Sequence, residues 1–307
     1  MMRRNVLQVV LAVGFFVLPG LMGAQEASSL FVPDSALPPV KTVKVFGQKI
    51  VYYEAGSGPT LVLVHGFASQ ARFDWGRVIV PLSKHHHVIA MDQIGFGRSE
   101  KPFIDYSVQT YVDFLGEFLR TLNVEKFDLA GESLGGWIVA NYTIQALDAG
   151  NTGKYALPKP SKLILEDAAG HTDPFKAGGS VGKIPITGTI QDAGGVAIVF
   201  YDKSLITPEF VRANFAMKLE ANDGMTERLL TANPKLASEV VAGKLDRITI
   251  PTLVVWGAND QLVPLDDGKD YAAKIPNARL VIVPECGHAA SLEKPKEFLA
   301  AVDGFLK

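Results

Sequence analysis

The feature of this sequence that most limits its possible folds is a series of short apolar runs separated by segments with helical spacing. The runs are rich in Val, Leu and Ile and apolar on both faces, as expected of strands in a sheet that is covered on both sides. They are TLVLVHG from Thr60, HHVIAMD from His86, KFDLAGE from Lys126, KLILEDA from Lys162, TLVVWG from Thr252 and ARLVIVP from Ala278. Strand and helix in alternation predict an α/β fold with a mostly parallel sheet.

Helical periodicity between these runs supports the same fold class. The segments are Val108 to Leu122, Leu134 to Leu147, Leu265 to Lys274 and Lys296 to Phe305. Ahead of them, residues 41–54 alternate between apolar and polar side chains around Gly47, which predicts a β-hairpin. We expect residues 41–168 and 247–307 to form one α/β core.

The alternation stops between residues 169 and 246, and this interval is expected to form a cap or lid inserted into the core. It begins with a Gly- and Pro-rich stretch and continues as helices predicted around Val196, Pro208 to Ala221 and Met225 to Ala232. A loosely packed structural excursion is the alternative. The apolar residues of this interval suggest a pocket for a small or medium apolar group, although most of them are expected to form the core of the cap itself.

The N-terminus has the order of a secretory signal, basic then apolar then small. Arg3 and Arg4 precede an apolar run from Val6 to Met22, and the preferred cleavage site follows Ala24. Residues 1–24 are therefore predicted to be a signal peptide that exports the protein to the periplasm or the medium, with 25–40 as an N-terminal extension. Twin-arginine export and an uncleaved membrane anchor are the alternatives.

Charge and cysteine content exclude several classes of protein. The 307 residues include 30 basic and 32 acidic side chains, and no basic run is long enough to grip a phosphate backbone. Nucleic acid is therefore not an expected partner. Cys286 is the only cysteine, so no intramolecular disulfide can form. The oligomeric state is not readable from the sequence.

A serine stands where an apolar run changes into a helix-like pattern, in FDLAGESLGGWIVANY, residues 127–142. At such a junction Ser133 must lie in a strained tight turn, where Gly131 and Gly135 leave room for strand and helix to approach. The free amides at the start of the helix then point at its hydroxyl, and the N–H of Leu134 can bind a developing oxyanion. Because a serine hydroxyl reacts poorly at neutral pH, the chain must also supply a base.

With this motif the sequence resembles the α/β-hydrolase fold family from about residue 41 to 306. The resemblance implies an eight-stranded, mostly parallel sheet with helices on both faces and an inserted helical cap. VHGF matches the family's turn after an earlier strand, so the backbone N–H of Phe67 is expected to be the second oxyanion donor and His65 to shape the turn. MDQIGFGRS matches the family's next loop and assigns Asp92 and Arg98 to hydrogen bonds that hold this loop.

The same resemblance places the other catalytic groups. His288, in PECGHAASLEKP, follows the last predicted strand, where the family carries its catalytic base. Asp260, in WGANDQLVP, lies on the loop after the penultimate strand and matches the acid that orients this base. Ser133, Asp260 and His288 follow one another in the α/β-hydrolase order. Asp167 ends the preceding strand and is the alternative acid, because some family members place it there.

Two further features invite a metal or redox interpretation. Three adjacent histidines, His85, His86 and His87, stand before a strand, but neighbouring strand residues point to opposite faces and do not converge on one ion. We expect a solvated turn there. Cys286 is interpreted as a small filler beside a strand end. We therefore predict neither a metal nor an organic cofactor.

The residues together predict a serine hydrolase that cleaves a carboxylic ester of a small or medium apolar substrate through an acyl-enzyme. Haloalkane dehalogenases and epoxide hydrolases are excluded, since they carry aspartate at the position of Ser133. The alternatives are C–C bond hydrolysis of the meta-cleavage-product type, lactone or amide hydrolysis, and acyl transfer. An alternative of another class is a non-catalytic ligand-binding protein with this fold. Export argues against a cytosolic step of aromatic degradation and favours the ester.

Overall fold

A computed structural model describes residues 30–176 and 186–307 of the chain. The predicted signal peptide, residues 1–24, lies outside the described residues, as does the first part of the predicted N-terminal extension. Nine residues of the predicted cap, 177–185, also lie outside them. In the parts that are described, no helix is both long and apolar enough to cross a membrane.

An eight-stranded sheet forms the centre of the molecule, in the order β1-β2-β4-β3-β5-β6-β7-β8. The strands are β1 (Val40–Val45), β2 (Gln48–Ala55), β3 (Thr60–Val64), β4 (His87–Met91), β5 (Phe127–Glu132), β6 (Leu163–Glu166), β7 (Thr252–Gly257) and β8 (Ala278–Val283). β2 runs antiparallel to β1 and β4, whereas the pairs from β4 to β8 are parallel. This confirms the predicted mostly parallel sheet. The predicted hairpin is β1–β2, and its turn residues Phe46 and Gly47 both have positive φ, as a tight hairpin turn requires.

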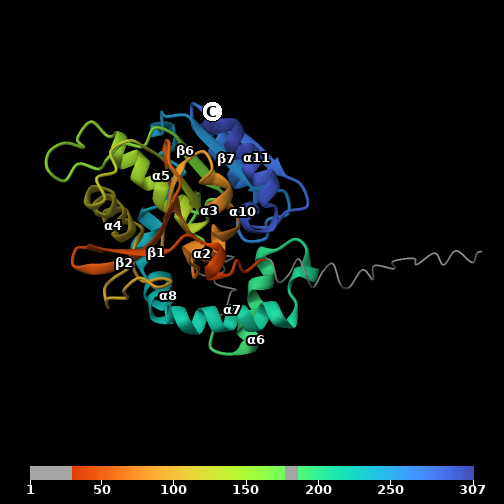
Figure 1. The fold of residues 1–307 in the computed structure, drawn as a ribbon. Coiled ribbons are helices and arrows are strands. Elements are labelled where there is room, and N and C mark those ends of the chain that lie inside the picture. The colour runs from red at the N-terminus through yellow and green to blue at the C-terminus, as the bar shows by residue number, and fades with distance from the viewer. Residues whose placement is uncertain (1–29, 177–185) are drawn as a thin grey trace, which may run out of the picture.

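Helices cover both faces of the sheet (Figure 1). They are α2 (Ala71–Asp74), α3 (Gly76–Leu82), α4 (Val108–Thr121), α5 (Leu134–Leu147), α9 (Leu265–Lys274), α10 (Ala290–Glu293) and α11 (Pro295–Leu306). Alternate residues of β3 show the two layers. Val62 and Val64 belong to the apolar cluster that contains the buried faces of α4 and α5. Leu61 and Leu63 belong to the cluster that contains those of α3 and α11.

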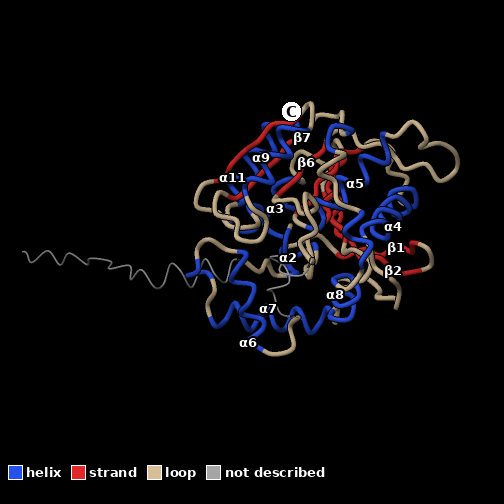
Figure 2. The backbone as a smooth tube through the Cα atoms, turned by 180° about the vertical axis from the view of Figure 1, so that it is seen from behind, coloured by secondary structure: helices blue, strands red, loops and turns tan. Residues whose placement is uncertain are grey.

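Helices α6 (Ile190–Ala193), α7 (Pro208–Ala221) and α8 (Gly224–Thr231) lie between β6 and β7 in the chain. Both views show them gathered on one side of the molecule, away from α4, α5 and α11 (Figures 1 and 2). Thr207 caps α7 and Pro208 occupies its first turn, while Asn222 ends it in the left-handed conformation. Short 3₁₀ helices complete the description: Asp34–Ala36, Gly194–Val199, Lys203–Leu205, Pro234–Ser238 and Leu245–Arg247. The helix expected around Val196 is thus a 3₁₀ helix.

The N-terminal segment packs against the cap helices and α2. Phe31 lies between Phe73 of α2 and Phe210 of α7, with ring centroids 5.1 and 5.2 Å apart. These rings belong to a third apolar cluster, whose fully buried members are Leu30, Phe73, Phe200, Leu205, Phe210, Met217, Ala289 and Leu292. Much of the apolar surface of the cap is therefore buried in a cluster that it shares with the N-terminal segment, α2 and α10.

Arginine pairs join the same three parts of the chain. Arg72 and Arg98 each bind both Asp34 of the N-terminal segment and Glu220 of α7, at 2.6 to 3.3 Å. The sequence prediction for Arg98 was incomplete. Its backbone N–H does donate to Asp92 and hold the loop, as expected, but its guanidinium reaches across to the cap.

Candidate active site

Ser133 stands in a sharp turn between β5 and α5. Its φ of 52° lies in the left-handed region that side chains other than glycine rarely adopt, so the turn is strained. Two glycines make the turn possible. A Cβ on Gly131 would lie 2.3 Å from the carbonyl oxygen of Gly135, and a Cβ on Gly135 would lie 2.1 Å from that of Val64. The strand and the helix can therefore approach only because these positions lack side chains, as the sequence predicted.

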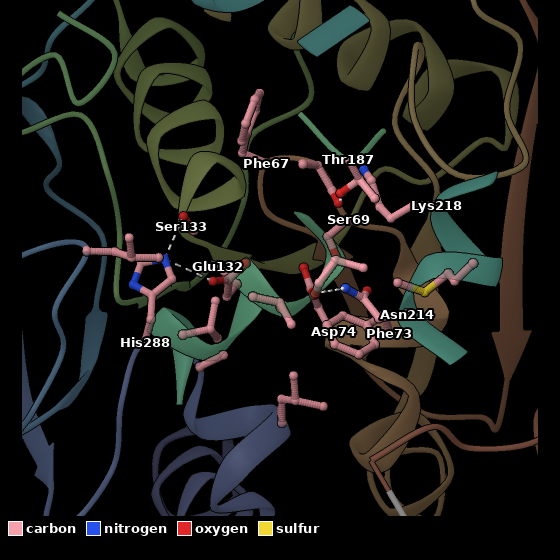
Figure 3. A pocket seen from close by; sticks show the side chains of 18 of the residues that line it. Phe67, Ser69, Phe73, Asp74, Glu132, Ser133, Thr187, Asn214, Lys218 and His288 are labelled. Atoms are coloured by element: carbon pink, nitrogen blue, oxygen red, sulfur yellow. Dashed lines mark hydrogen bonds and ion pairs between the residues drawn. The ribbon is translucent and has the colours of Figure 1, made fainter. Parts of the chain in front are cut away.

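The structure brings together the three residues predicted from the order of motifs. His288 Nε2 lies 2.8 Å from Ser133 Oγ, and His288 Nδ1 lies 2.7 Å from Asp260 Oδ2. Figure 3 shows the imidazole turned toward the serine from the loop after β8. This is the geometry in which a histidine can take the proton of a serine while a carboxylate holds the ring.

Backbone contacts hold the acid and the base in place. Asp260 follows β7, and its Oδ1 accepts hydrogen bonds from the amides of Leu262 and Val263, at 2.7 and 3.0 Å. Its Oδ2 is thereby left for the histidine. The amide of His288 donates to the carbonyl oxygen of Val199 in the cap segment, at 2.6 Å. The base is thus tied to the cap as well as to the sheet.

The alternative acid, Asp167, has a different environment. It is fully buried at the end of β6, and its Oδ1 accepts a hydrogen bond from the Gly257 amide at 2.8 Å. Burial, with the nearby Asp260 carboxylate, raises the pKa of Asp167 well above its usual range. No hydrogen bond joins Asp167 to His288 within residues 30–176 and 186–307. Asp260, not Asp167, is therefore the acid that contacts the base.

Asp167, Asp260 and His288 also bring three atoms of metal-ligating type within 4.8 Å of one another. Two of these side chains are bonded to each other, through His288 Nδ1 and Asp260 Oδ2. A metal ion taking those atoms would have to displace that hydrogen bond, so the donor set fits a hydrogen-bonded pair better than an ion.

The two predicted oxyanion donors flank the serine. Leu134 is the first residue of α5, where backbone N–H groups have no partner inside the helix. Phe67 follows Gly66 in the turn after β3, and its side chain lines the cavity beside Ser133. Among the described residues, neither the Phe67 nor the Leu134 amide donates a hydrogen bond. Both are thus available to a substrate oxygen.

A cavity opens over Ser133, between the sheet and the cap (Figure 3). Most of its lining is apolar, and its members from the sheet side include Phe67, Phe73 and Leu262. The cap contributes Val196 and Met217. Phe200 and Phe210 of the cap are buried in the third apolar cluster, as expected of most apolar residues of this interval. Ile184 lies outside the described residues.

Glu132 and Asp74, two of the four acidic residues that line the described part of this cavity, were not singled out from the sequence. Glu132 directly precedes Ser133, and Asp74 ends α2; both line the cavity and are about 95% buried. Glu132 Oε1 lies 3.4 Å from His288 Nε2. The sequence did contain a signal for Glu132, because this residue directly precedes the nucleophile at the end of a strand. Neighbouring side chains there point in different directions but lie at the same edge of the sheet. Asp74 has no such signal in the sequence.

His65, His87 and Cys286 have structural surroundings. His65 is buried, with Nδ1 2.8 Å from the Gly66 carbonyl oxygen and Nε2 accepting from the Gln93 amide at 3.0 Å. Both ring nitrogens are used, which confirms that it shapes the turn. His87 binds Glu54 at 2.7 Å. Cys286 is buried, and burial raises the pKa of its thiol. It has the surroundings of the small filler that we expected.

Comparison with known proteins places this fold and site in one family. The model of the alpha/beta hydrolase family matches residues 61–302. The chain therefore belongs to the α/β hydrolase family and is an enzyme of that type. The family resemblance that the motifs indicated is thus confirmed, together with the predicted fold.

Relatives and solved structures extend across most of the chain. It is 28% identical over 275 residues to a 2-hydroxy-6-oxo-6-(2'-aminophenyl)hexa-2,4-dienoic acid hydrolase of Metapseudomonas resinovorans, covering 86% of this chain and 89% of the relative. It is 30% identical to a 2-hydroxy-6-oxononadienedioate/2-hydroxy-6-oxononatrienedioate hydrolase of Comamonas testosteroni, covering 80% and 86%. A solved structure described as an N-acyl homoserine lactone degrading enzyme superposes with a TM-score of 0.72 at 25% identity, covering 86% and 100%.

Proposed function

We propose that this chain is a serine hydrolase that cleaves carboxylic esters through an acyl-enzyme on Ser133. The observation that carries the proposal is the unbroken line of contacts from Ser133 Oγ through His288 to Asp260, at 2.8 and 2.7 Å. Ser133 and His288 line a cavity whose surface is mostly apolar. Such a cavity suits an apolar acyl group.

The mechanism follows from these positions. His288 Nε2 removes the proton of Ser133 as the oxygen attacks the ester carbonyl. The N–H groups of Phe67 and Leu134 stabilise the negative oxygen that forms. His288 then gives its proton to the departing alcohol, and a water activated by the same nitrogen releases the acid. Asp260 keeps the Nδ1 proton in place throughout and stabilises the charged ring.

Ester cleavage is favoured over C–C cleavage by the charges of the cavity. The relatives named above act on dienoic acids and dienedioates, which carry carboxylates. Lys218 is the lysine or arginine that lines the cavity in the described part of the chain. Its ammonium already donates to Asp223, Glu227 and the Ala68 carbonyl oxygen, at 2.8, 2.5 and 3.0 Å. All three of its donors are therefore used, and the described residues of the cavity offer a substrate carboxylate no free lysine or arginine.

C–C bond hydrolysis of the meta-cleavage type is the second candidate, because the relatives with 28% and 30% identity carry such names. A lactone is a cyclic ester, so the resemblance to a lactone-degrading enzyme at 25% identity supports ester chemistry. The two reactions share the serine and the histidine and differ in the bond that breaks. Substrate assays must therefore separate them.

Short p-nitrophenyl esters and a 2-hydroxy-6-oxohexa-2,4-dienoate are to be offered to the wild type and to Ser133→Ala. We expect ester turnover by the wild type that falls by about 10³-fold or more in the variant. Turnover of the dienoate but not of the esters would contradict the proposed ester cleavage and support C–C cleavage. A fluorophosphonate label on wild type but not on Ser133→Ala tests the nucleophile without regard to substrate. Absence of label and of all turnover would remove the serine hydrolase.

Export is also part of the proposal, on the strength of the basic, apolar and small segments within residues 1–24. N-terminal sequencing of the protein recovered from its native compartment tests this. A first residue near position 25 is expected, whereas an intact N-terminus in the membrane fraction would favour the anchored alternative.

A further inference from the structure

The carboxyl groups of Glu132 and Asp74 meet beside the nucleophile, although they come from different elements. Glu132 ends β5, and Asp74 ends α2. Both carboxyls lie against Gly66: its amide donates to Asp74 Oδ2 at 2.8 Å, and a Cβ on it would lie 2.1 Å from Glu132 Oε2. Two buried carboxylates so placed repel each other when both are ionised, which favours a single proton held by the pair.

The surrounding donors show which of the two carboxyls is ionised. Asp74 Oδ2 accepts a hydrogen bond from the Gly66 amide at 2.8 Å, and its Oδ1 accepts from the Ser69 hydroxyl at 2.5 Å. Glu132 receives no hydrogen bond from any N–H or O–H of residues 30–176 and 186–307 within ordinary distance. Burial without a donor favours the protonated form of Glu132, so the proton of the pair is assigned to Glu132.

The electrostatic surroundings agree with this assignment. Burial, with the neighbouring carboxyls of Asp74 and Glu166, raises the pKa of Glu132 well above its usual range. Asp167 adds to the same effect from the end of β6. The pair therefore carries about one negative charge in a setting that water screens poorly.

The position of the pair indicates which part of a substrate it meets. Glu132 Oε1 lies 3.4 Å from His288 Nε2, the atom that hands a proton to the departing group. Any leaving oxygen or sulfur must come within hydrogen-bond distance of that nitrogen. The substituent on the leaving group therefore lies within a few ångströms of Glu132, which points into the cavity (Figure 3).

Gly66 shows how closely the acid is fitted to this position. A Cβ on Gly66 would lie 2.1 Å from Glu132 Oε2 and 3.1 Å from the Cβ of Ser133. The glycine before Phe67 thus makes room for the Glu132 carboxyl beside the nucleophile. Aromatic rings of Phe67 and Phe73 line the same cavity. An anionic pair with nearby aromatic faces is a favourable environment for an ammonium group.

We propose that the Asp74–Glu132 pair is the specificity element of the cavity: it selects esters whose alcohol or thiol carries a positively charged ammonium group and rejects those with a carboxylate there. The inference rests on the proposed ester hydrolysis and adds the charge of the substrate to it. Lys218 is paired with Asp223 and Glu227, and the acid 3.4 Å from His288 Nε2, where the leaving group departs, is Glu132 of the pair.

Three thioesters of butyric acid test this selection. Butyrylthiocholine carries the ammonium, S-(3,3-dimethylbutyl) thiobutyrate is its uncharged carbon analogue, and S-(2-carboxyethyl) thiobutyrate carries a carboxylate. Each releases a thiol that one colorimetric reagent detects. For wild type we expect kcat/KM for the cationic ester to exceed that for the anionic ester by about tenfold or more, with the neutral ester between them. An anionic ester cleaved as well as the cationic one would overturn the proposal.

Variants of the pair give a pattern that a structural role does not produce. Glu132→Gln and Asp74→Asn each leave one carboxyl, which can hold the single negative charge, so each should retain most of the selectivity. The double variant has none and should lose it, with the ratio falling to within about threefold of unity. Asp266→Asn, which removes an acid that is 86% exposed on α9, is the matched control and should behave as wild type. Selectivity that persists in a folded double variant contradicts the proposal.

A second measurement does not depend on ester turnover. A phosphonylthiocholine and its uncharged dimethylbutyl analogue both place a thiol leaving group beside Glu132 while phosphonylating Ser133, and mass spectrometry follows the label. Faster labelling by the cationic reagent supports the charge selection even if no thioester is hydrolysed. Equal labelling rates with normal ester turnover would remove the selection and leave the esterase. Thermal unfolding of each variant shows whether it is folded. If the double variant is unfolded, the order of the wild-type rates with the cationic, neutral and anionic compounds decides whether the selection exists.

Discussion

His288 Nδ1 lies 2.7 Å from Asp260 Oδ2, while Asp260 Oδ1 is occupied by the amides of Leu262 and Val263. The carboxylate can therefore turn only one oxygen to the ring. Asparagine at this position would keep its carbonyl oxygen on the two amides and present its NH₂ group to the histidine. Nδ1 would then have to accept, which places the ring proton on Nε2 and blocks removal of the serine proton.

We accordingly expect Asp260→Asn to lower kcat for a p-nitrophenyl ester by about 10³- to 10⁴-fold, with little change in thermal stability. Steady-state kinetics and the rate of fluorophosphonate labelling measure the loss. Asp266→Asn on α9 serves as the control for removal of a carboxylate. A loss of less than tenfold in Asp260→Asn would mean that Asp167 can take over as the acid.

Glu166 provides a pH-dependent test of the carboxyl groups beneath the site. It is fully buried at the end of β6, with Oε1 2.5 Å from the Ser291 amide and Oε2 unpartnered among the described residues. Burial raises the pKa of Glu166 to about 8. An unfolded chain would release this proton near pH 4.5, so the folded protein binds more protons between these values. Its stabilising contribution is complete below pH 4.5 and is lost as the pH rises to about 8.

Glu166→Gln removes the loss of stability at high pH, since the glutamine amide stays neutral at every pH. Compared with wild type, its midpoint of thermal unfolding should rise by about 2–4 °C or more at pH 8.5 and change little at pH 4.5. Differential scanning calorimetry at the two values measures the difference. A gap between the two proteins that is the same at both pH values would show that Glu166 does not keep its proton in the folded state.

The sequence was most informative where a residue lies at the end of a strand. Ser133, Asp260 and His288 each follow a strand of the parallel sheet, and parallel strands bring their carboxyl ends to one edge. The family resemblance predicted their meeting, and this arrangement of the strands is its physical reason. The same reasoning placed Leu134, because a helix that begins at a known residue leaves its first amides free.

Contacts between side chains of unrelated elements could not be predicted in this way. Asp74 stands on a four-residue helix whose direction depends on packing, and no periodicity links it to Glu132. Arg98 and Glu220 are 122 positions apart, and their contact depends on where the cap lies over the core. Such distances are set by tertiary packing, which a single sequence does not report.

Gly135, two residues after the nucleophile, provides a test of how tightly the turn between β5 and α5 is packed. A Cβ on Gly135 would stand 2.1 Å from the Val64 carbonyl oxygen, which belongs to the backbone and cannot move aside. We expect Gly135→Ala to lower the free energy of unfolding by about 3 kcal/mol or more, measured by urea denaturation. Gly194→Ala is the matched control, because its φ is −69° and nothing lies within 4 Å of the added carbon. It should be neutral or stabilise by about 0.4–1 kcal/mol. Equal effects of the two changes would contradict the crowding argument.

The last prediction concerns the ion pairs that join the cap to the core. Asp34 and Glu220 each bind Arg72 and Arg98, and both acids are about half exposed. Partial burial raises the pKa of each acid, but the two arginines lower it by more. The pKa of Asp34 therefore lies below 3.8 and that of Glu220 below 4.5. Stability from such acids is present above their unfolded pKa values and is lost as the pH falls through the folded ones.

Solvent screening keeps the effect of each acid small. Asp34→Asn and Glu220→Gln should each cost about 0.2–1 kcal/mol at pH 7, and the double variant should cost less than the sum, since both acids share the same arginines. Their cost should shrink as the pH falls toward 3. Glu117→Gln is the control, because Glu117 pairs with Arg120 alone on α4 at 2.9 Å. Urea denaturation at pH 7 and pH 3.5 measures the four variants and the wild type. Additive losses in the double variant would show that the four residues act as separate surface pairs and do not hold the cap as a unit.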